Sequence, residues 1–401
     1  MKILTSLFFR KMSGIVLLLL TFKTISFAQS SIVTHYKFSD DIEKAIEQDS
    51  FPSKYQIGAM NYAICGYYRD ALRTWDANSP GKIPRYDSTI VSFFEHCKKI
   101  DARKYILKLS RKERIIIINE AHHHARHRNF TASLLKGLYK NGFRYLGLEA
   151  LWVDTLINRR HFVSFDDGVY VRDPEFGNLI HEATRIGFTV FGYEATDIQN
   201  SQDREEKQAR NIMDFLNRNP PGKVLIFCGY AHAYENEYKP WGKAMAGRLK
   251  EYMGIDVFTI DQTKYSEKHS PQANPIFVNL VEGDFPVVLM DTQGRPFNGL
   301  SDNNQTDVVI IYPKTNYIEG KPIWQTYHRK PHAIKLRDVE MPVLALAYRK
   351  GEYEKKGVPA DIVEIKSRRD DKTIFLSPGE YEIVLQNERN EVIETYSIAI
   401  D

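Results

Sequence analysis

Ionisable side chains follow four apolar segments of this chain at the points where the segments end. Glu120 and His122 come after the apolar residues 115–118, and three later segments end in a similar way. Their ionisable residues are Glu149, Glu194 and His232. Carboxylates and imidazoles move protons and bind metals in enzymes. Because Glu is a poor strand residue, its repeated occurrence at segment ends indicates a shared functional site.

The segment 119–128 holds four of the chain's 12 histidines and allows two arrangements. If the chain stays extended, Glu120 and His122 point to the same side. If it is helical from His123 onward, then His123 and His127 share a face at a spacing that suits a metal pair. The residue pattern leaves both arrangements open.

A metal-dependent hydrolysis fits part of this set. His122, Glu149 and His232 would supply two imidazoles and one carboxylate, which leaves an open coordination position on the metal. Zinc, manganese and iron all accept such ligands, so the residue types do not choose among them. A bound divalent metal is therefore an expectation that stays open at this point.

A metal-free hydrolysis fits the same segments. One His or Glu would take a proton from water, and Arg204 would either stabilise the developing oxyanion or bind a carboxylate of the substrate. Crowded carboxylates raise one another's pKa, so we expect Glu120, Glu149 and Glu194 to divide into an acid and a base. No Gly-x-Ser-x-Gly motif is present, and none of the three cysteines is expected beside a His at this edge. Water is therefore the expected nucleophile.

The elements that must position these residues alternate between strands and helices. Apolar strand-like segments occupy residues 115–118, 143–148, 188–193, 224–228 and 256–261, and residues 307–312 resemble a late strand. Helical segments separate them, at about residues 130–140, 174–186, 204–218 and 241–253. Right-handed connections turn such a chain into a parallel sheet with helices on both faces. The sequence predicts this α/β domain over residues 111–330, with ligands bound beyond the carboxyl ends of the strands.

Two further regions flank the α/β domain. Residues 29–110 have helical spacing, with a segment near Tyr62–Leu72 that resembles one tetratricopeptide-type hairpin and that we expect to cap the next domain. Residues 331–401 contain short strand-like segments separated by turns, which predicts a small, sandwich-like β module. We assign the β module no chemistry.

Residues 1–28 have the character of a signal peptide. They carry four basic residues and no acid, a short apolar run, and small residues at the end. Without them, 51 basic residues remain from 55 and balance 51 acidic ones, so nothing indicates a nucleic-acid partner. We expect an exported, soluble protein, periplasmic or secreted, with no membrane-spanning segment after cleavage. The expected partner is a small-molecule or peptide substrate, and the oligomeric state is undetermined.

Several of these motifs together resemble one superfamily, which joins erythromycin esterases, ChaN-type haem-binding proteins and Tiki-type proteases. The shared motifs are Glu120-Ala121-His122, Leu148-Glu149, Arg204 before a helix, and Gly229-Tyr230-Ala231-His232. They cover about residues 114–262. The resemblance implies the α/β fold and an exported hydrolase-like activity. Where the families place Gly before the acid, this chain has Asn119, which we expect to narrow the approach to the first strand end.

The first segment is most similar to the ChaN branch, in which an acid and a His are followed by a further His, matched here by His127. This resemblance implies an alternative function as a haem- or iron-binding protein, with Tyr230 and His127 as candidate ligands. A second alternative is a non-catalytic binding protein of the cell envelope.

Overall fold

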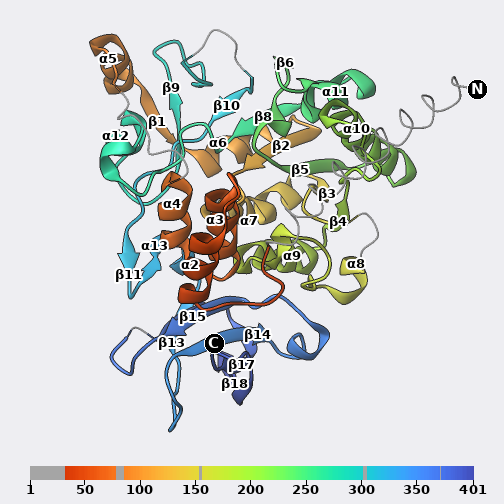
Figure 1. The fold of residues 1–401 in the computed structure, drawn as a ribbon. Helices are drawn as coiled ribbons and strands as arrows, with labels where there is room; N and C mark the ends of the chain where they lie inside the picture. Colours follow the sequence, from red (N-terminus) through yellow and green to blue (C-terminus); the bar gives the residue numbers. More distant parts are fainter. Residues whose placement is uncertain (1–31, 78–84, 153–155, 301–304, 371) are drawn as a thin grey trace, which may run out of the picture.

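The computed structural model describes residues 32–77, 85–152, 156–300, 305–370 and 372–401 (Figure 1). The predicted signal peptide, residues 1–28, lies outside the described residues, and export stays a prediction. Within the described ranges, none of the helices combines the length and the apolar character needed to cross a membrane.

A six-stranded parallel sheet forms the centre of the molecule, in the order β10-β8-β2-β5-β3-β4. The strands are β2 (Ile115–Glu120), β3 (Phe143–Leu148), β4 (Thr189–Gly192), β5 (Lys223–Gly229), β8 (Phe258–Asp261) and β10 (Val308–Val309). All six residues of β2 are buried, as expected of a β-branched strand covered on both faces. The predicted late strand is confirmed as the edge strand β10.

Helices cover both faces of this sheet, as predicted. The main ones are α7 (Arg126–Lys140), α9 (Pro174–Ile186), α10 (Ser201–Arg218) and α11 (Met245–Met253). Along β2, Ile116 and Ile118 pack in one apolar core with α7 and α9, while Ile115 and Ile117 pack in another with α10 and α11. Because successive strand residues point to opposite faces, one unbroken apolar run supplies both cores.

The bounds of α9 agree with the sequence prediction because local signals mark both ends. The Asp173 side chain accepts hydrogen bonds from two backbone N–H groups of the first turn, and Pro174 follows it. Gly187 ends the helix with a left-handed φ of 109°. The helix expected at 241–253 begins later, because Gly242–Lys243 forms the short strand β7 with β6 (Glu237–Tyr238).

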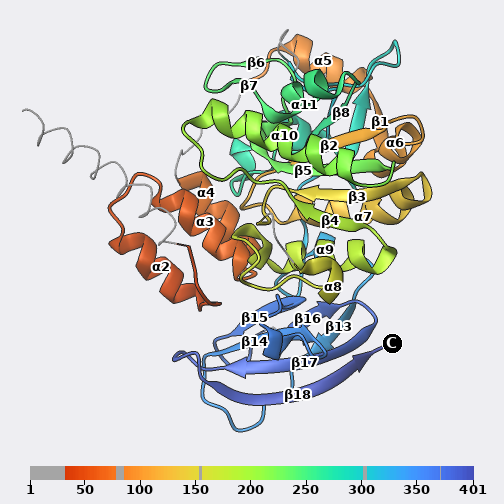
Figure 2. The same ribbon diagram turned by 90° about the vertical axis from the view of Figure 1, so that its right-hand side faces the viewer.

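The described residues of the N-terminal region, 32–77 and 85–110, are mainly helical. Its helices are α2 (Ser39–Gln48), α3 (Lys54–Ile64), α4 (Tyr68–Ala77), α5 (Ser88–His96) and α6 (Ala102–Leu109). Helices α3 and α4 form the predicted hairpin (Figure 2). Lys98–Asp101 was expected to be helical and is instead the strand β1, which pairs with β9 (Val287–Met290). Its partner is far away in sequence, so local spacing could not reveal the pairing.

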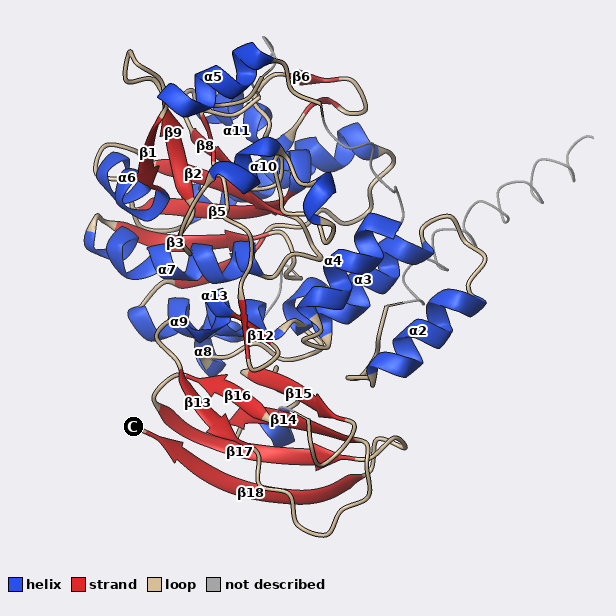
Figure 3. Ribbon diagram, turned by 90° about the vertical axis from the view of Figure 1, so that its left-hand side faces the viewer, coloured by secondary structure: helices blue, strands red, loops and turns tan. Residues whose placement is uncertain are grey.

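The C-terminal region consists of two antiparallel sheets, β15-β14-β17-β18 and β13-β16 (Figure 3). Their bounds are β13 (Lys330–Ala333), β14 (Val343–Arg349), β15 (Asp361–Ile365), β16 (Thr373–Leu376), β17 (Gly379–Gln386) and β18 (Val392–Ile400). An apolar core lies between the two sheets, as in the predicted sandwich. The other face of the larger sheet packs against the N-terminal helices. The domain limits near residues 110 and 330 stay predictions.

Short elements complete the described chain. They are α8 (Ile157–Arg160), α12 (Ile276–Leu280), α13 (Ile323–Thr326), β11 (Tyr317–Ile318), β12 (Lys321–Pro322) and the 3-10 turns Tyr170–Arg172, Tyr230–Ala233, Pro271–Ala273 and Tyr353–Lys355. The first two of these 3-10 turns bear on function, because they lie beside the carboxyl ends of β2 and β5.

Candidate functional site

The predicted site residues lie together at one edge of the central sheet. Strands β2, β5, β3 and β4 are neighbours, and their carboxyl ends carry the candidate carboxylates and histidines. Glu149 Oε1 lies 3.5 Å from His232 Nε2, although the two residues are 83 positions apart. The edge therefore collects side chains from four strands, as expected of a parallel sheet.

Arg204 is the centre of this group. Its Nη2 donates to Glu149 Oε1 at 2.7 Å and to Glu194 Oε2 at 2.5 Å, and its Nε donates to Glu194 Oε1 at 3.0 Å. Its Nη1 donates to His232 Nε2 at 2.9 Å. A guanidinium has five N–H donors, so one on Nη1 has no partner among the described residues. The Arg204 side chain is 26% exposed, so part of it is accessible from solvent.

The predicted metal set of His122, Glu149 and His232 is not arranged for a metal. Within the described residues, no group of three or more His, Cys, Asp or Glu side chains is placed to hold one. The Nε2 lone pair of His232 accepts from Arg204, and the same guanidinium pairs with Glu149. The cation that contacts both Glu149 and His232 is therefore Arg204.

A second set of hydrogen bonds orients the His122 side chain. Its Nδ1 lies 3.0 Å from Glu120 Oε1, so the neutral ring with hydrogen on Nδ1 donates to that carboxylate. Arg128 binds both oxygens of Glu120, at 2.5 and 3.0 Å, and its Nη1 lies 3.3 Å from Asp173 Oδ2. Glu120 orients the imidazole, and Arg128 supplies the positive charge that keeps Glu120 ionised.

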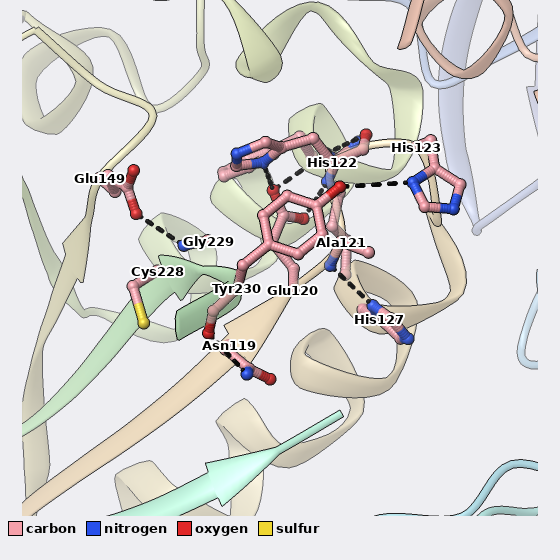
Figure 4. Close-up of polar contacts among 12 residues, drawn as sticks. Asn119, Glu120, Ala121, His122, His123, His127, Glu149, Cys228, Gly229 and Tyr230 are labelled. Atoms are coloured by element: carbon pink, nitrogen blue, oxygen red, sulfur yellow. Dashed lines mark hydrogen bonds and ion pairs between the residues drawn. The ribbon is translucent and has the colours of Figure 1, made fainter. Parts of the chain in front are cut away.

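Aromatic rings and one glycine define the space around His122. The Tyr170 ring stacks on His122 with centroids 3.8 Å apart. The Tyr230 ring meets His122 edge-on, with centroids 5.0 Å apart (Figure 4). A Cβ at Gly229 would lie 2.6 Å from His122 Cε1, so only glycine leaves room for the imidazole here. The Gly229 N–H also donates to Glu149 Oε2 at 2.6 Å. His122 Nε2 makes no hydrogen bond to any described residue.

His232 is held by a different carboxylate. Its Nδ1 lies 2.8 Å from Glu205 Oε2, which also accepts from the Met245 N–H at the start of α11. Burial opposes the charged ring, but Glu149 and Glu205 outweigh it and raise the pKa of His232. The contact from Arg204 requires the neutral ring with hydrogen on Nδ1, so a second proton on Nε2 would break that contact.

Glu120 and Glu149 do not divide into an acid and a base, contrary to the expectation from crowding. Burial alone would raise the pKa of Glu149, but His232 and Arg204 lower it below its usual value. For Glu120, burial is likewise outweighed, chiefly by Arg128, and the pKa is lowered. Both carboxylates are therefore ionised near neutral pH, which leaves proton transfer to the imidazoles.

The proposed haem ligands do not share an open face. His127 is 0% exposed, and its Nδ1 accepts from the Ala121 N–H at 3.0 Å. The Tyr230 hydroxyl lies 3.4 Å from His123 Nδ1. The Trp75 ring, on α4, stacks on the His123 ring with centroids 3.9 Å apart. These positions do not fit haem, whose iron could not reach His127 without opening the core.

We expected Asn119, which stands where the related families have glycine, to narrow the approach to the end of β2. The structure contradicts this prediction. The Asn119 side chain is fully buried and donates to the Tyr230 carbonyl at 2.8 Å and to Asp261 Oδ1 at 2.9 Å. It therefore ties the ends of β2, β5 and β8 together. This bond also holds Tyr230, whose φ of 41° is unusual for a residue with a side chain.

Three buried histidines lie beneath the site without taking part in it. His123, His124 and His127 are at most 5% exposed, and α7 begins only at Arg126, so the helical arrangement with a His123–His127 pair does not occur. Burial is the largest influence on His124 and, with Arg126 and Lys268, lowers its pKa to about 3.

We predict that His124→Gln changes how stability depends on pH. The unfolded chain protonates this ring below about pH 6.5, whereas the folded chain does not until about pH 3, so folding free energy is lost as the pH falls through that window. Between pH 7 and 5, the unfolding free energy of the variant should rise by about 2 kcal/mol relative to wild type. Urea titrations at both pH values measure this, with His96→Gln on exposed α5 as the control. If the difference in unfolding free energy between the variant and wild type were the same at pH 7 and pH 5, the prediction would be contradicted.

Several residues of the site were missed by the sequence analysis. Arg128 follows the His-rich segment and Glu205 adjoins Arg204, so nearby charge was an available signal for both. Nothing in the local pattern marks Tyr170 or Trp75, because each reaches the site only through tertiary packing.

A polar hollow of about 680 Å³ lies away from these residues, among α2, α3, α4, the β11–β12 turn and β15. Its charged side chains are largely paired with one another, as in the contacts of Arg73 with Glu43 and of Lys366 with Asp40. We assign it no chemistry.

Comparisons with known proteins give only distant likenesses. No protein-family model matches this chain, and no curated protein matches it. The type III effector HopBA1 is 12% identical with a TM-score of 0.36, over 54% of this chain and 97% of that one. ChaN of Campylobacter jejuni, described with cofacial haem binding, is 11% identical with a TM-score of 0.33, over 54% and 94%. Pasteurella multocida toxin, described with a thiol-protease-like triad, is 12% identical with a TM-score of 0.31, over 52% and 31%.

At these identities and TM-scores the likenesses carry no argument about activity. Membership of the erythromycin esterase, ChaN and Tiki superfamily therefore stays a prediction. The function must be argued from the contacts of the site itself.

Proposed function

We propose that this protein is a hydrolase-like enzyme that uses His122 as a general base on water. The observation that carries the proposal is the Glu120–His122 contact: Nδ1 is engaged by an ionised carboxylate, while Nε2 has no described partner. This arrangement fixes the tautomer in which Nε2 accepts a proton, as the orienting carboxylate does in hydrolytic triads.

The reaction needs a second group for the charge that develops on the substrate. Water loses a proton to His122 Nε2, its oxygen adds to a carbonyl carbon, and the leaving group later takes the proton from His122. The free N–H of Arg204 Nη1 can donate to the oxyanion. Glu149 connects His122 and Arg204, because one of its oxygens accepts from Arg204 and the other accepts from the Gly229 N–H beside His122. An ester or amide of a small molecule or peptide fits this chemistry.

We expect Arg204→Lys to lower turnover about 10- to 100-fold, because Lys keeps the charge but loses the planar set of donors. The measurement is hydrolysis of a panel of p-nitrophenyl esters and anilides by the wild-type chain and the variant. Arg210→Lys on the same helix α10 is the matched control and should keep wild-type turnover. Equal turnover in all three proteins would exclude Arg204 from the reaction.

A haem-binding role is the alternative that the resemblance implied. No contact of the site favours it, because His127 is enclosed and the Tyr230 hydroxyl is engaged by His123.

A further inference from the structure

Glu194 contacts Arg204 through both of its carboxylate oxygens. Its two oxygens accept from Arg204 Nε and Nη2, and Oε1 also accepts from Gln208 Nε2 at 3.0 Å and from the Ala195 N–H at 2.7 Å. Four donors hold the carboxylate in one position, and its side chain is 19% exposed. Glu194 therefore holds a partly exposed carboxylate against the guanidinium of Arg204.

The charges around this point do not favour an anionic ligand. Arg204 contacts two carboxylates, Glu149 and Glu194, so its single positive charge is outnumbered. The other guanidinium of the site, on Arg128, is 1% exposed and faces Glu120 and Asp173. His232 is 6% exposed and faces Glu205. An incoming anion would thus meet excess negative charge, at a place where partial burial strengthens the repulsion.

We infer that Glu194 is a specificity-determining residue that restricts the site to substrates without an anionic group beside the reacting carbonyl. The inference rests on the proposed function in assigning Arg204 to the reacting oxygen. Glu194 leaves one hydrogen-bond donor of Arg204 available but cancels its attraction for phosphate, sulfate or carboxylate groups. The substrates are then uncharged esters or amides at the reacting end.

Binding of inorganic phosphate tests the charge inference without any turnover. Calorimetry on the wild-type chain should show no binding at millimolar phosphate, whereas Glu194→Gln should bind it at least tenfold more tightly. Glu182→Gln removes the same charge from an exposed ion pair with Arg185 and should behave as wild type. Glu194→Asp keeps the charge and should also not bind phosphate. Tight binding by wild type, or equal gains in Glu194→Gln and Glu182→Gln, would overturn the inference.

Turnover separates this inference from the proposed function. The two substrates are an uncharged p-nitrophenyl ester and its analogue with a carboxylate beside the carbonyl. In wild type, kcat/KM should be higher for the uncharged ester than for the analogue. In Glu194→Gln, the ratio of the first value to the second should fall at least tenfold. A ratio that does not change overturns the inference. If no ester or amide is hydrolysed but the phosphate result holds, the charge selectivity stands and the hydrolase proposal fails. If Glu194→Gln does not fold, wild type and Glu194→Asp still decide, since strong phosphate binding by either contradicts the inference.

Discussion

His122→Asn should lower turnover of the ester or amide substrate by about 10²- to 10⁴-fold with little change in fold. The Asn side chain can still donate a hydrogen bond to Glu120, so the loop that carries residue 122 keeps its anchor. It has no group that accepts a proton near neutral pH, so the attack by water loses its base. Steady-state kinetics measure the loss, and circular dichroism checks the fold.

The matched control is His96→Asn on the exposed surface of α5. It makes the same chemical change away from the site and should keep wild-type kinetics. Turnover that survives in His122→Asn would show that another group activates water. His232 would then be the next candidate, because its Nε2 lies 2.9 Å from Arg204 Nη1.

Arg128→Met should cost about 3–5 kcal/mol of unfolding free energy, the largest stability change we expect. The substitution leaves Glu120 and Asp173 buried without their cation, and the side chains of these two carboxylates are 3% and 0% exposed. Burial already raises the pKa of Asp173 to about 7 despite Arg128, so Asp173 can take a proton in the variant and the uncompensated charge falls chiefly on Glu120. Urea unfolding at neutral pH measures the loss.

Arg185→Met provides the comparison, because it removes a guanidinium that is 60% exposed from its pair with Glu182. That change should cost less than about 1 kcal/mol. The double variant Arg128→Met/Glu120→Gln should recover part of the loss, since it removes one of the uncompensated charges. A single variant as stable as Arg185→Met would mean that Glu120 does not depend on Arg128.

Local patterns were sufficient to predict the α/β fold and the edge where the site lies. The β-branched run of β2, the capping of α9 by Asp173 and its end at Gly187 are signals within a few residues of one another. Polar residues directly after buried strands then mark the carboxyl edge of a parallel sheet. The meeting of Glu149 with His232 follows from that topology alone, because neighbouring parallel strands end together.

Pairings over long sequence distances were not predictable in this way. Strand β1 depends on hydrogen bonds to β9, and Trp75 reaches His123 only because α4 packs over the site. Neither β1 nor α4 contains a local sequence pattern that indicates which distant segment it contacts.

The charge states of the site were decided by tertiary structure. A list of Glu and His residues at strand ends fits a metal centre or an acid–base pair equally well. The fold places the Arg204 guanidinium between Glu149, Glu194 and His232, and the Arg128 guanidinium against Glu120. The two guanidinium groups help to lower the pKa of Glu120 and of Glu149, and Arg204 occupies the lone pair of His232 and one oxygen of Glu149 that the predicted metal would have needed. The ionisation of a buried group depends on its depth and on neighbours from distant segments, and both exist only in the folded chain.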